Sequence, residues 1–136
     1  MEDEVRSGNC ESEAKAHNLD IGLRGEVAAA KLLERHGYEI VDRNWRCKAG
    51  EADIVAIDED ALVFVEVKTR VGIESGMPDE AITPRKRDRY ERIAAWYLAD
   101  HDFSDMQVRF DTVSVLVIAE DRALVKHVVN AFGAGD

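Results

Sequence analysis

Apolar residues recur at helical spacing along the first part of the chain, from Asn18 to His36. Asn18 or Asp20 can cap the start of this helix, and Gly37 suits the left-handed position that follows a helix end. Residues 1–17, in contrast, contain almost no large apolar side chains, so they cannot bury enough surface to offset the entropy of ordering. We therefore predict a disordered acidic leader over residues 1–17, followed by a first helix.

Five further segments have the apolar density or the alternation that is typical of strands. They cover residues 38–43, 52–57, 62–67, 108–118 and 124–129. A second helix interrupts them, because Thr83 and Pro84 form an N-cap followed by proline and helical spacing continues to about Ala99. The predicted fold is α/β, a mixed central sheet flanked by helices in the order α-β-β-β-α-β-β, with one domain over residues 18–132 and a flexible tail over 133–136.

The second and third predicted strands form a hairpin that carries charged residues at one end. A turn of even length between them pairs Asp53 with Glu66 and Glu51 with Lys68 across the strands. Side-chain alternation then places these four residues on one face of the sheet. The two strands are otherwise apolar on both faces, so the charges must be paired, bound to a metal or exposed to a cleft.

Carboxylates and a lysine in this arrangement favour metal-dependent phosphodiester chemistry. Mg²⁺ or Mn²⁺ prefers carboxylate oxygens, which Asp53 and Glu66 would supply, and such a metal activates water and neutralises charge on phosphate oxygens. Lys68 shares their face and is placed to orient the attacking water or to stabilise the transition state. Glu26 on the first helix and Lys86 on the second are also expected to reach this cleft.

Composition limits the possible partners. No apolar run approaches the roughly 20 residues that span a bilayer, and the acidic N-terminus lacks the features of a signal peptide, so we expect a cytoplasmic protein with no membrane partner. The formal net charge of −10 argues against a general polyanion binder, because nucleic-acid affinity comes largely from Lys and Arg. Positive charge nevertheless gathers near the predicted cleft, in Arg43, Arg46, Lys48 and residues 85–92.

Other residue types carry weaker signals. The two cysteines have neither disulfide nor zinc spacing and are expected to be free thiols, and the four histidines are expected at the surface or at helix ends. Gly22 and Gly25 indicate either a close approach of the first helix to a neighbour or a frayed first turn. Trp96 is expected in the core, whereas Trp45 is the better candidate for stacking on a base.

Several short motifs together resemble the YraN-type family of small bacterial proteins. They span about residues 22–111 and are Gly22-x-x-Gly25-Glu26, Gly37-Tyr38, Arg43-Asn44-x-Arg46, Gly50-Glu51-x-Asp53-Ile54-Val55 and Val63-Phe64-Val65-Glu66-Val67-Lys68-x-Arg70. That family is similar to the restriction-endonuclease-like PD-(D/E)XK nucleases and to archaeal Holliday-junction resolvases, although Ala52 stands where the superfamily name has proline. The resemblance implies Asp53, Glu66 and Lys68 as catalytic residues, and Glu26, Asp53 and Glu66 as ligands of Mg²⁺ or Mn²⁺.

The resemblance also implies a nucleic acid, expected to be DNA, as the partner, and a twofold homodimer if the substrate is a junction. Contacts with the nucleic acid are expected from the basic residues Arg43, Arg46, Arg70, Lys86 and Arg89. The sequence thus predicts a metal-dependent endonuclease that hydrolyses phosphodiester bonds in structured or branched DNA.

Plainer interpretations stay open beside this one. Asp53, Glu66 and Lys68 fit a structural salt-bridge network, and Glu26 fits the favourable position of an acid near the positive end of a helix. The basic run of residues 85–92 fits a solvated helical face. The alternative function is a non-catalytic nucleic-acid-binding or protein-binding module that retains the fold, which the net negative charge and the acidic leader favour.

Overall fold

The computed structural model describes residues 10–72, 83–103 and 105–131; the predicted leader residues 1–9 and the predicted tail 133–136 lie outside these ranges. The elements are α2 (Cys10–Arg35), β1 (Glu39–Cys47), β2 (Gly50–Asp58), β3 (Ala61–Val71), α3 (Pro84–Asp100), β4 (Gln107–Ala119) and β5 (Arg122–Val128). The strands form one sheet in the order β1-β2-β3-β4-β5, in which β3 and β4 are parallel and the other neighbours are antiparallel. The predicted order of elements and the mixed central sheet are confirmed.

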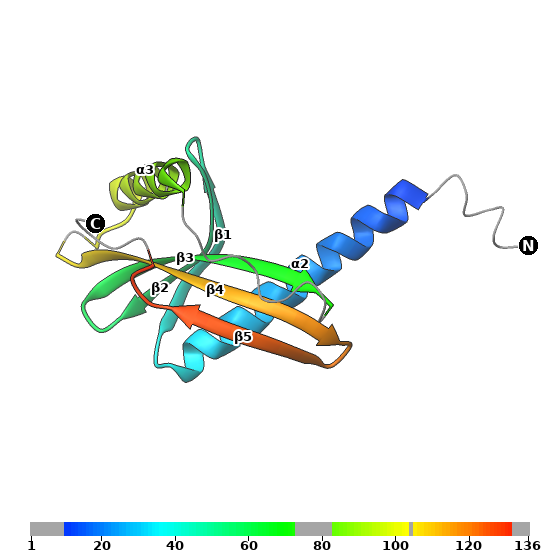
Figure 1. The fold of residues 1–136 in the computed structure, drawn as a ribbon. Helices are drawn as coiled ribbons and strands as arrows, with labels where there is room; N and C mark the ends of the chain where they lie inside the picture. The colour runs from blue at the N-terminus through cyan, green and yellow to red at the C-terminus, as the bar shows by residue number, and fades with distance from the viewer. Residues whose placement is uncertain (1–9, 73–82, 104, 132–136) are drawn as a thin grey trace, which may run out of the picture.

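The two helices cover opposite faces of this sheet (Figure 1). Ala29 and Leu33 of α2 pack on one face, and Tyr90 and Ile93 of α3 pack on the other. Strands β2 and β3 lie between these layers, so both of their faces are buried and their sequences are nearly continuous apolar runs. Charged residues on these two strands are therefore placed where few charges are tolerated without a partner.

The start of α2 differs from the prediction. The helix begins at Cys10, earlier than the predicted caps Asn18 and Asp20, so residues 10–17 of the expected disordered leader are helical. Glu, Ala and Lys make up most of this stretch, and they are strong helix formers that need no apolar packing to extend an existing helix. Neither helix in the described ranges has the length and apolar character needed to span a membrane.

The end of α2 is the one that the sequence predicted. Gly37 takes a left-handed φ of +90°. Its N–H donates to the Glu34 carbonyl, and the Tyr38 N–H donates to the Leu33 carbonyl. This pair of hydrogen bonds satisfies the last carbonyls of the helix and turns the chain sharply into β1.

The β2–β3 hairpin has the even-length turn that the charged residues require. Asp58 pairs with Ala61, and Glu59 in the two-residue turn takes a left-handed φ of +56°. The pairing stays in register along the hairpin from Asp58 and Ala61 to Ile54 and Val65, and Asp53 and Glu66 are the next residues of the two strands. The predicted even turn and the register of the hairpin up to the two carboxylates are therefore confirmed.

The β1–β2 hairpin exchanges its two faces near its tip. Asn44 takes a left-handed φ of +54°. Beyond it, Ala52 and its strand partner Trp45 pack among the apolar residues that contact α3, which we call the α3 cluster. Strand alternation would instead place Ala52 on the face opposite Asp53, which is the α2 side. The tip consequently lies beside α3 (Figure 1). A Cβ built at Gly50 would stand 3.3 Å from Cδ of Arg89, so the contact is close.

Gly25 allows α2 to lie close against β3. A Cβ at this position would stand 2.0 Å from Oγ1 and 3.0 Å from Cβ of Thr69, whereas a Cβ at Gly22 would meet no atom within 4 Å. Of the two interpretations of these glycines, a close approach of the helix to a neighbouring element therefore holds for Gly25. The approach fixes the position along the sheet at which the next residue, Glu26, stands.

We expect the G25A variant to lower the free energy of unfolding by about 1–2 kcal/mol, because overpacking of this contact outweighs the better helix propensity of alanine. G22A is the matched control, and it is expected to raise the free energy of unfolding by up to about 1 kcal/mol, since the added methyl group meets open space. Urea unfolding of both variants measures the contrast. Equal stabilisation by the two substitutions would contradict the close approach of Gly25 to Thr69.

Candidate functional site

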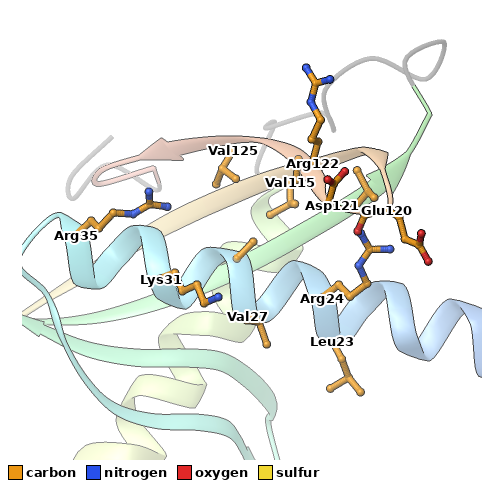
Figure 2. A pocket seen from close by; sticks show the side chains of 13 residues that line it. Leu23, Arg24, Val27, Lys31, Arg35, Val115, Glu120, Asp121, Arg122 and Val125 are labelled. Carbon is orange, nitrogen blue, oxygen red and sulfur yellow. The ribbon is translucent and has the colours of Figure 1, made fainter.

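A hollow of about 490 Å³ lies between α2 and the β4–β5 hairpin, and Figure 2 shows its lining. Val115 and Val125 form its apolar floor, and Arg24 at one end donates hydrogen bonds to the carbonyl oxygens of Ala119 and Glu120. The acids in its lining are exposed residues of the β4–β5 turn. This hollow therefore offers no desolvated group with a chemical role.

A more polar cleft of about 400 Å³ lies on the α3 side, at the end of the β2–β3 hairpin. It is lined by Gly50, Glu51, Asp53, Glu66, Val67, Lys68, Lys86, Arg89 and Tyr90, and we call it the acidic cleft. The predicted site residues Asp53, Glu66, Lys68 and Lys86 thus surround one space, although they come from β2, β3 and α3. Helix α3 supplies Lys86 because this residue begins the helical stripe that is buried against the sheet.

Glu66 is the most strongly paired acid of the cleft. Its side chain is 8% exposed, and the Lys86 Nζ lies 2.9 Å from its Oε2. The Lys68 Nζ lies 3.9 Å from the same oxygen, and Nη2 of Arg89 lies 3.7 Å from Oε1. Three cations from β3 and α3 therefore neutralise this one carboxylate. For Glu66 and Lys68 this agrees with the alternative hypothesis of a structural salt-bridge network.

Asp53 has a different environment, because it takes part in none of the ion pairs found within the described residues. Its Oδ2 accepts a hydrogen bond of 2.8 Å from the Val67 N–H. Burial raises the pKa of Asp53 to about 7; the Val67 hydrogen bond opposes this shift, whereas the charges of Glu26, Glu66 and Glu51 add to it. Glu26 contributes the largest of the three charge effects, although this residue of α2 is not among those that line the acidic cleft.

This concentration of carboxylates fits a divalent cation in its donor chemistry. Asp53, Glu66 and Glu26 offer the oxygen ligands that Mg²⁺ and Mn²⁺ prefer, and a cation would relieve the repulsion that raises the pKa of Asp53. Across residues 10–72, 83–103 and 105–131, however, no three His, Cys, Asp or Glu side chains are already grouped to hold a metal. Binding would therefore require Glu66 to exchange Lys86 for the cation.

The predicted nucleic-acid-binding residues are not all at the cleft. Arg89 lines it, and Arg46 stands at its rim with Nε 3.8 Å from Oε2 of Glu51. Arg70 is exposed on β3, two residues beyond Lys68. Arg43 is exposed on the edge strand β1 and does not line the cleft.

Two buried hydroxyl groups lie next to the acidic cleft and had no signal in the sequence. Thr112 and Ser114 on β4 are the register partners of Glu66 and Lys68 on β3. Both are fully buried, and neither Thr112 Oγ1 nor Ser114 Oγ has a hydrogen-bond partner among the residues that the structure describes. Only the pairing of two strands far apart in the sequence brings them to this place.

The two tryptophans differ in burial, and Trp96 is the more exposed of the two. Trp45 packs edge-on against Tyr97, with 4.9 Å between the ring centroids, at the margin of the α3 cluster. Trp96 is 44% exposed, and the Lys48 Nζ stands 6.0 Å from its ring centroid. The prediction of a buried Trp96 is wrong because this residue lies outside the apolar stripe that α3 turns toward the sheet.

A second charged cluster is buried around Asp111, at the end of α2. The Asp111 carboxylate is 0% exposed; it accepts hydrogen bonds from the Tyr38 hydroxyl, from Nε of Arg109 and from the Asn130 N–H, and Nε2 of His127 lies 2.8 Å away. Burial alone would raise the pKa of Asp111, but the bonds from His127, Arg109 and Asn130 lower it to about 2. His127, predicted at the surface, is thus part of a satisfied internal network, which we interpret as structural.

Comparison with known proteins gives one family. The model of the uncharacterised protein family UPF0102 matches residues 25–115. A UPF0102 protein of Geobacter sulfurreducens is 43% identical over 120 residues, which cover 88% of this chain and 94% of that protein. One from Rhodococcus jostii is 45% identical over 117 residues, with 86% and 99% covered, and one from Beutenbergia cavernae is 50% identical over 107 residues, with 79% and 91% covered. The matched region includes all the residues that line the acidic cleft.

Proposed function

The chain belongs to the uncharacterised protein family UPF0102, the YraN-type family, and we propose that it is a metal-dependent endonuclease acting on branched or otherwise structured DNA. One observation carries the proposal. The desolvated Asp53 stands among three other carboxylates without a cation partner in the described residues, beside the lysine Lys68 in the same cleft. Desolvated acids with raised pKa values in a cleft are typical of sites that bind a cation or transfer protons.

Asp53 and Glu66, with Glu26 from α2, would hold Mg²⁺ or Mn²⁺. When bound, the cation supplies activation of water and neutralisation of charge on the phosphate. The Val67 N–H fixes the orientation of Asp53 through its hydrogen bond. Lys68 supplies a compact positive charge, held near Glu66, that stabilises the negative charge developing on the phosphate oxygens.

Lys86 and Arg89 have a role on the substrate side of the cleft. Both are within 4 Å of Glu66, and both stand on α3 rather than on the sheet. If Glu66 turned to a bound cation, these two side chains would be free to contact phosphates beside the scissile bond. If the substrate is a four-way junction, two symmetric cuts require a twofold dimer.

A second candidate is a non-catalytic nucleic-acid-binding or protein-binding module. The pairing of Glu66 with three cations favours it, because a carboxylate in such a network is stabilised without any metal. In that case the acidic cleft is a structural element, and the basic residues around it contact the partner.

Cleavage of labelled four-way, flapped and single-stranded DNA in the presence of Mn²⁺ separates the two candidates. We expect the wild-type protein to cleave at least one substrate, and the K68M variant to cleave it about 100-fold more slowly, because the transition-state charge loses its cation. K31M is the matched control, since Lys31 is an exposed lysine of α2 that lines the opposite hollow. Binding of all substrates with no cleavage by the wild type would favour the non-catalytic module.

A further inference from the structure

The outward face of α3 combines arginine side chains with an exposed tryptophan. Arg85, Arg89, Arg92 and Trp96 follow one another at intervals of four, three and four residues, so they share one side of the helix, and we call them the α3 stripe. Among the large hydrophobic side chains found exposed in the described part of the chain, Trp96 is the aromatic one. A single exposed apolar residue is ordinary, but an indole in line with three guanidinium groups has the composition of a nucleic-acid surface.

The α3 stripe is continuous with the acidic cleft. Arg89 lines the cleft, with Nη2 3.7 Å from Oε1 of Glu66. The tip of the β1–β2 hairpin adds the Lys48 ammonium above the Trp96 ring and Arg46, whose side chain is 81% exposed. Basic side chains therefore line the surface between the cleft and Trp96, although the whole chain has a net charge of −10.

Two of the three acids on α3 pair with arginines of the same helix. Asp88 pairs with Arg92 at 2.8 Å, and Glu91 pairs with Arg87 at 3.9 Å. In both pairs the partners lie one helical turn apart; Asp88 and Arg92 are solvent-exposed, Arg87 is half-buried, and such surface pairs contribute little free energy. A phosphate oxygen can therefore replace Asp88 as the partner of Arg92 at a small cost.

We propose that the α3 stripe binds a nucleic-acid strand and that an unpaired base stacks on Trp96. The distance between this base and the cleavage position rests on the proposed nuclease function of the acidic cleft. Seven residues separate Arg89 from Trp96, which is about 10 Å along a helix and about three base steps of a stacked strand. A base inside a duplex has both faces covered by its neighbours, so an unpaired base is the one that can use the indole as a platform. The substrate class is a nucleic acid with an unpaired segment about three nucleotides from the cleavage position.

The test measures binding in EDTA, where no cleavage occurs, by fluorescence anisotropy of a single strand, a blunt duplex and the same duplex with a central gap. W96A is expected to weaken binding of the single strand and of the gapped duplex roughly tenfold, and binding of the blunt duplex less than about twofold. W96F keeps an aromatic platform and is expected to stay within about threefold of the wild type. L124A is the matched control, because Leu124 is 52% exposed on β5, a strand that contributes no residue to the cleft or the stripe.

Tryptophan fluorescence gives a direct readout of stacking. The chain has two tryptophans, so in a W45F variant Trp96 is the remaining one. Quenching of its emission by the single strand, and not by the blunt duplex, is the expected result. Equal quenching by both, or none, would contradict stacking of an unpaired base on Trp96.

The outcomes separate this proposal from the nuclease proposal. If W96A binds every DNA as the wild type does, or loses affinity equally for all three, the α3 stripe is not a platform for an unpaired base, whether or not the wild type cleaves. If W96A changes sedimentation of the protein without changing DNA binding, Trp96 is a protein contact and the proposal is wrong. If Trp96 selects unpaired DNA and Mn²⁺ never produces cleavage, the stripe stands and the nuclease proposal falls.

Discussion

At pH 8 and without added metal, the D53N variant is expected to unfold at a higher temperature than the wild-type protein. The folded-state pKa of Asp53, about 7, lies above its ordinary value of 3.8, so the folded protein holds this proton more tightly than the unfolded chain does. The stability that the protonated carboxyl contributes is present below about pH 4 and is lost as the pH rises through 7. At pH 8 the ionised carboxylate therefore costs on the order of 2–4 kcal/mol, which asparagine avoids while its amide oxygen still accepts the Val67 N–H.

Urea unfolding at pH 5 and pH 8 checks this prediction, because the advantage of D53N is expected to grow between the two pH values. Excess Mg²⁺ or Mn²⁺ should then favour the wild type, which gains about 2.7 kcal/mol when the metal is at 100 times its dissociation constant, whereas the variant gains little. DNA cleavage by D53N is expected to fall to background. A variant that is less stable than the wild type at pH 8 without metal would show that a cation or proton already balances the carboxylates around Asp53.

Replacing Asp111 with alanine is expected to lower the free energy of unfolding by about 3–5 kcal/mol. The change removes the acceptor of the Tyr38 hydroxyl and leaves Arg109 with Asp58, 3.1 Å away, as its one remaining carboxylate partner in the described residues. The pKa of Asp111, about 2, lies below its ordinary value of 3.8. The stability that this carboxylate contributes is therefore present above about pH 4 and is lost as the pH falls toward 2.

Urea unfolding at pH 7 and pH 3 measures both effects. The wild type is expected to lose more stability between these pH values than D111N, which cannot ionise at position 111. The double variant D111A/R109M is the control, and it is expected to be more stable than the sum of the single changes predicts, because both single changes remove the same Arg109–Asp111 interaction. A loss below about 1 kcal/mol in D111A would contradict the structural role of the cluster.

The β2–β3 hairpin that carries the acids could be predicted from sequence, because its pairing depends only on residues that are close together in the chain. Strand alternation and an even turn are enough to set Asp53 opposite Glu66 on one face, and Lys86 followed from the helical stripe that it begins. The residues Thr112 and Ser114 could not be placed in the same way. They come to lie next to the cleft through the pairing of β3 with β4, and no short-range pattern encodes the register of two parallel strands separated by a helix.

The wrong prediction of a buried Trp96 and the packing of Trp45 against α3 have a related cause. Burial of an aromatic residue depends on the direction in which its element presents it, so apolar neighbours in the sequence were a poor guide for Trp96. Helical spacing did contain the correct signal, since the arithmetic that groups Arg85, Arg89 and Arg92 also includes Trp96. For Trp45 no such signal exists, because the left-handed Asn44 changes the face of β1 on which it lies.

The turn at Glu59 and Asp60 is exposed and makes no contact with the acidic cleft, yet it determines the spacing of the charges there. Six residues of β-strand, about 20 Å, separate Glu59 from Asp53. One residue inserted into this turn would shift β3 by one position against β2 and direct Glu66 and Lys68 to the α2 side. Surface turns usually tolerate insertions, but in this protein the length of the chain between Asp58 and Ala61 is under the same constraint as the site itself.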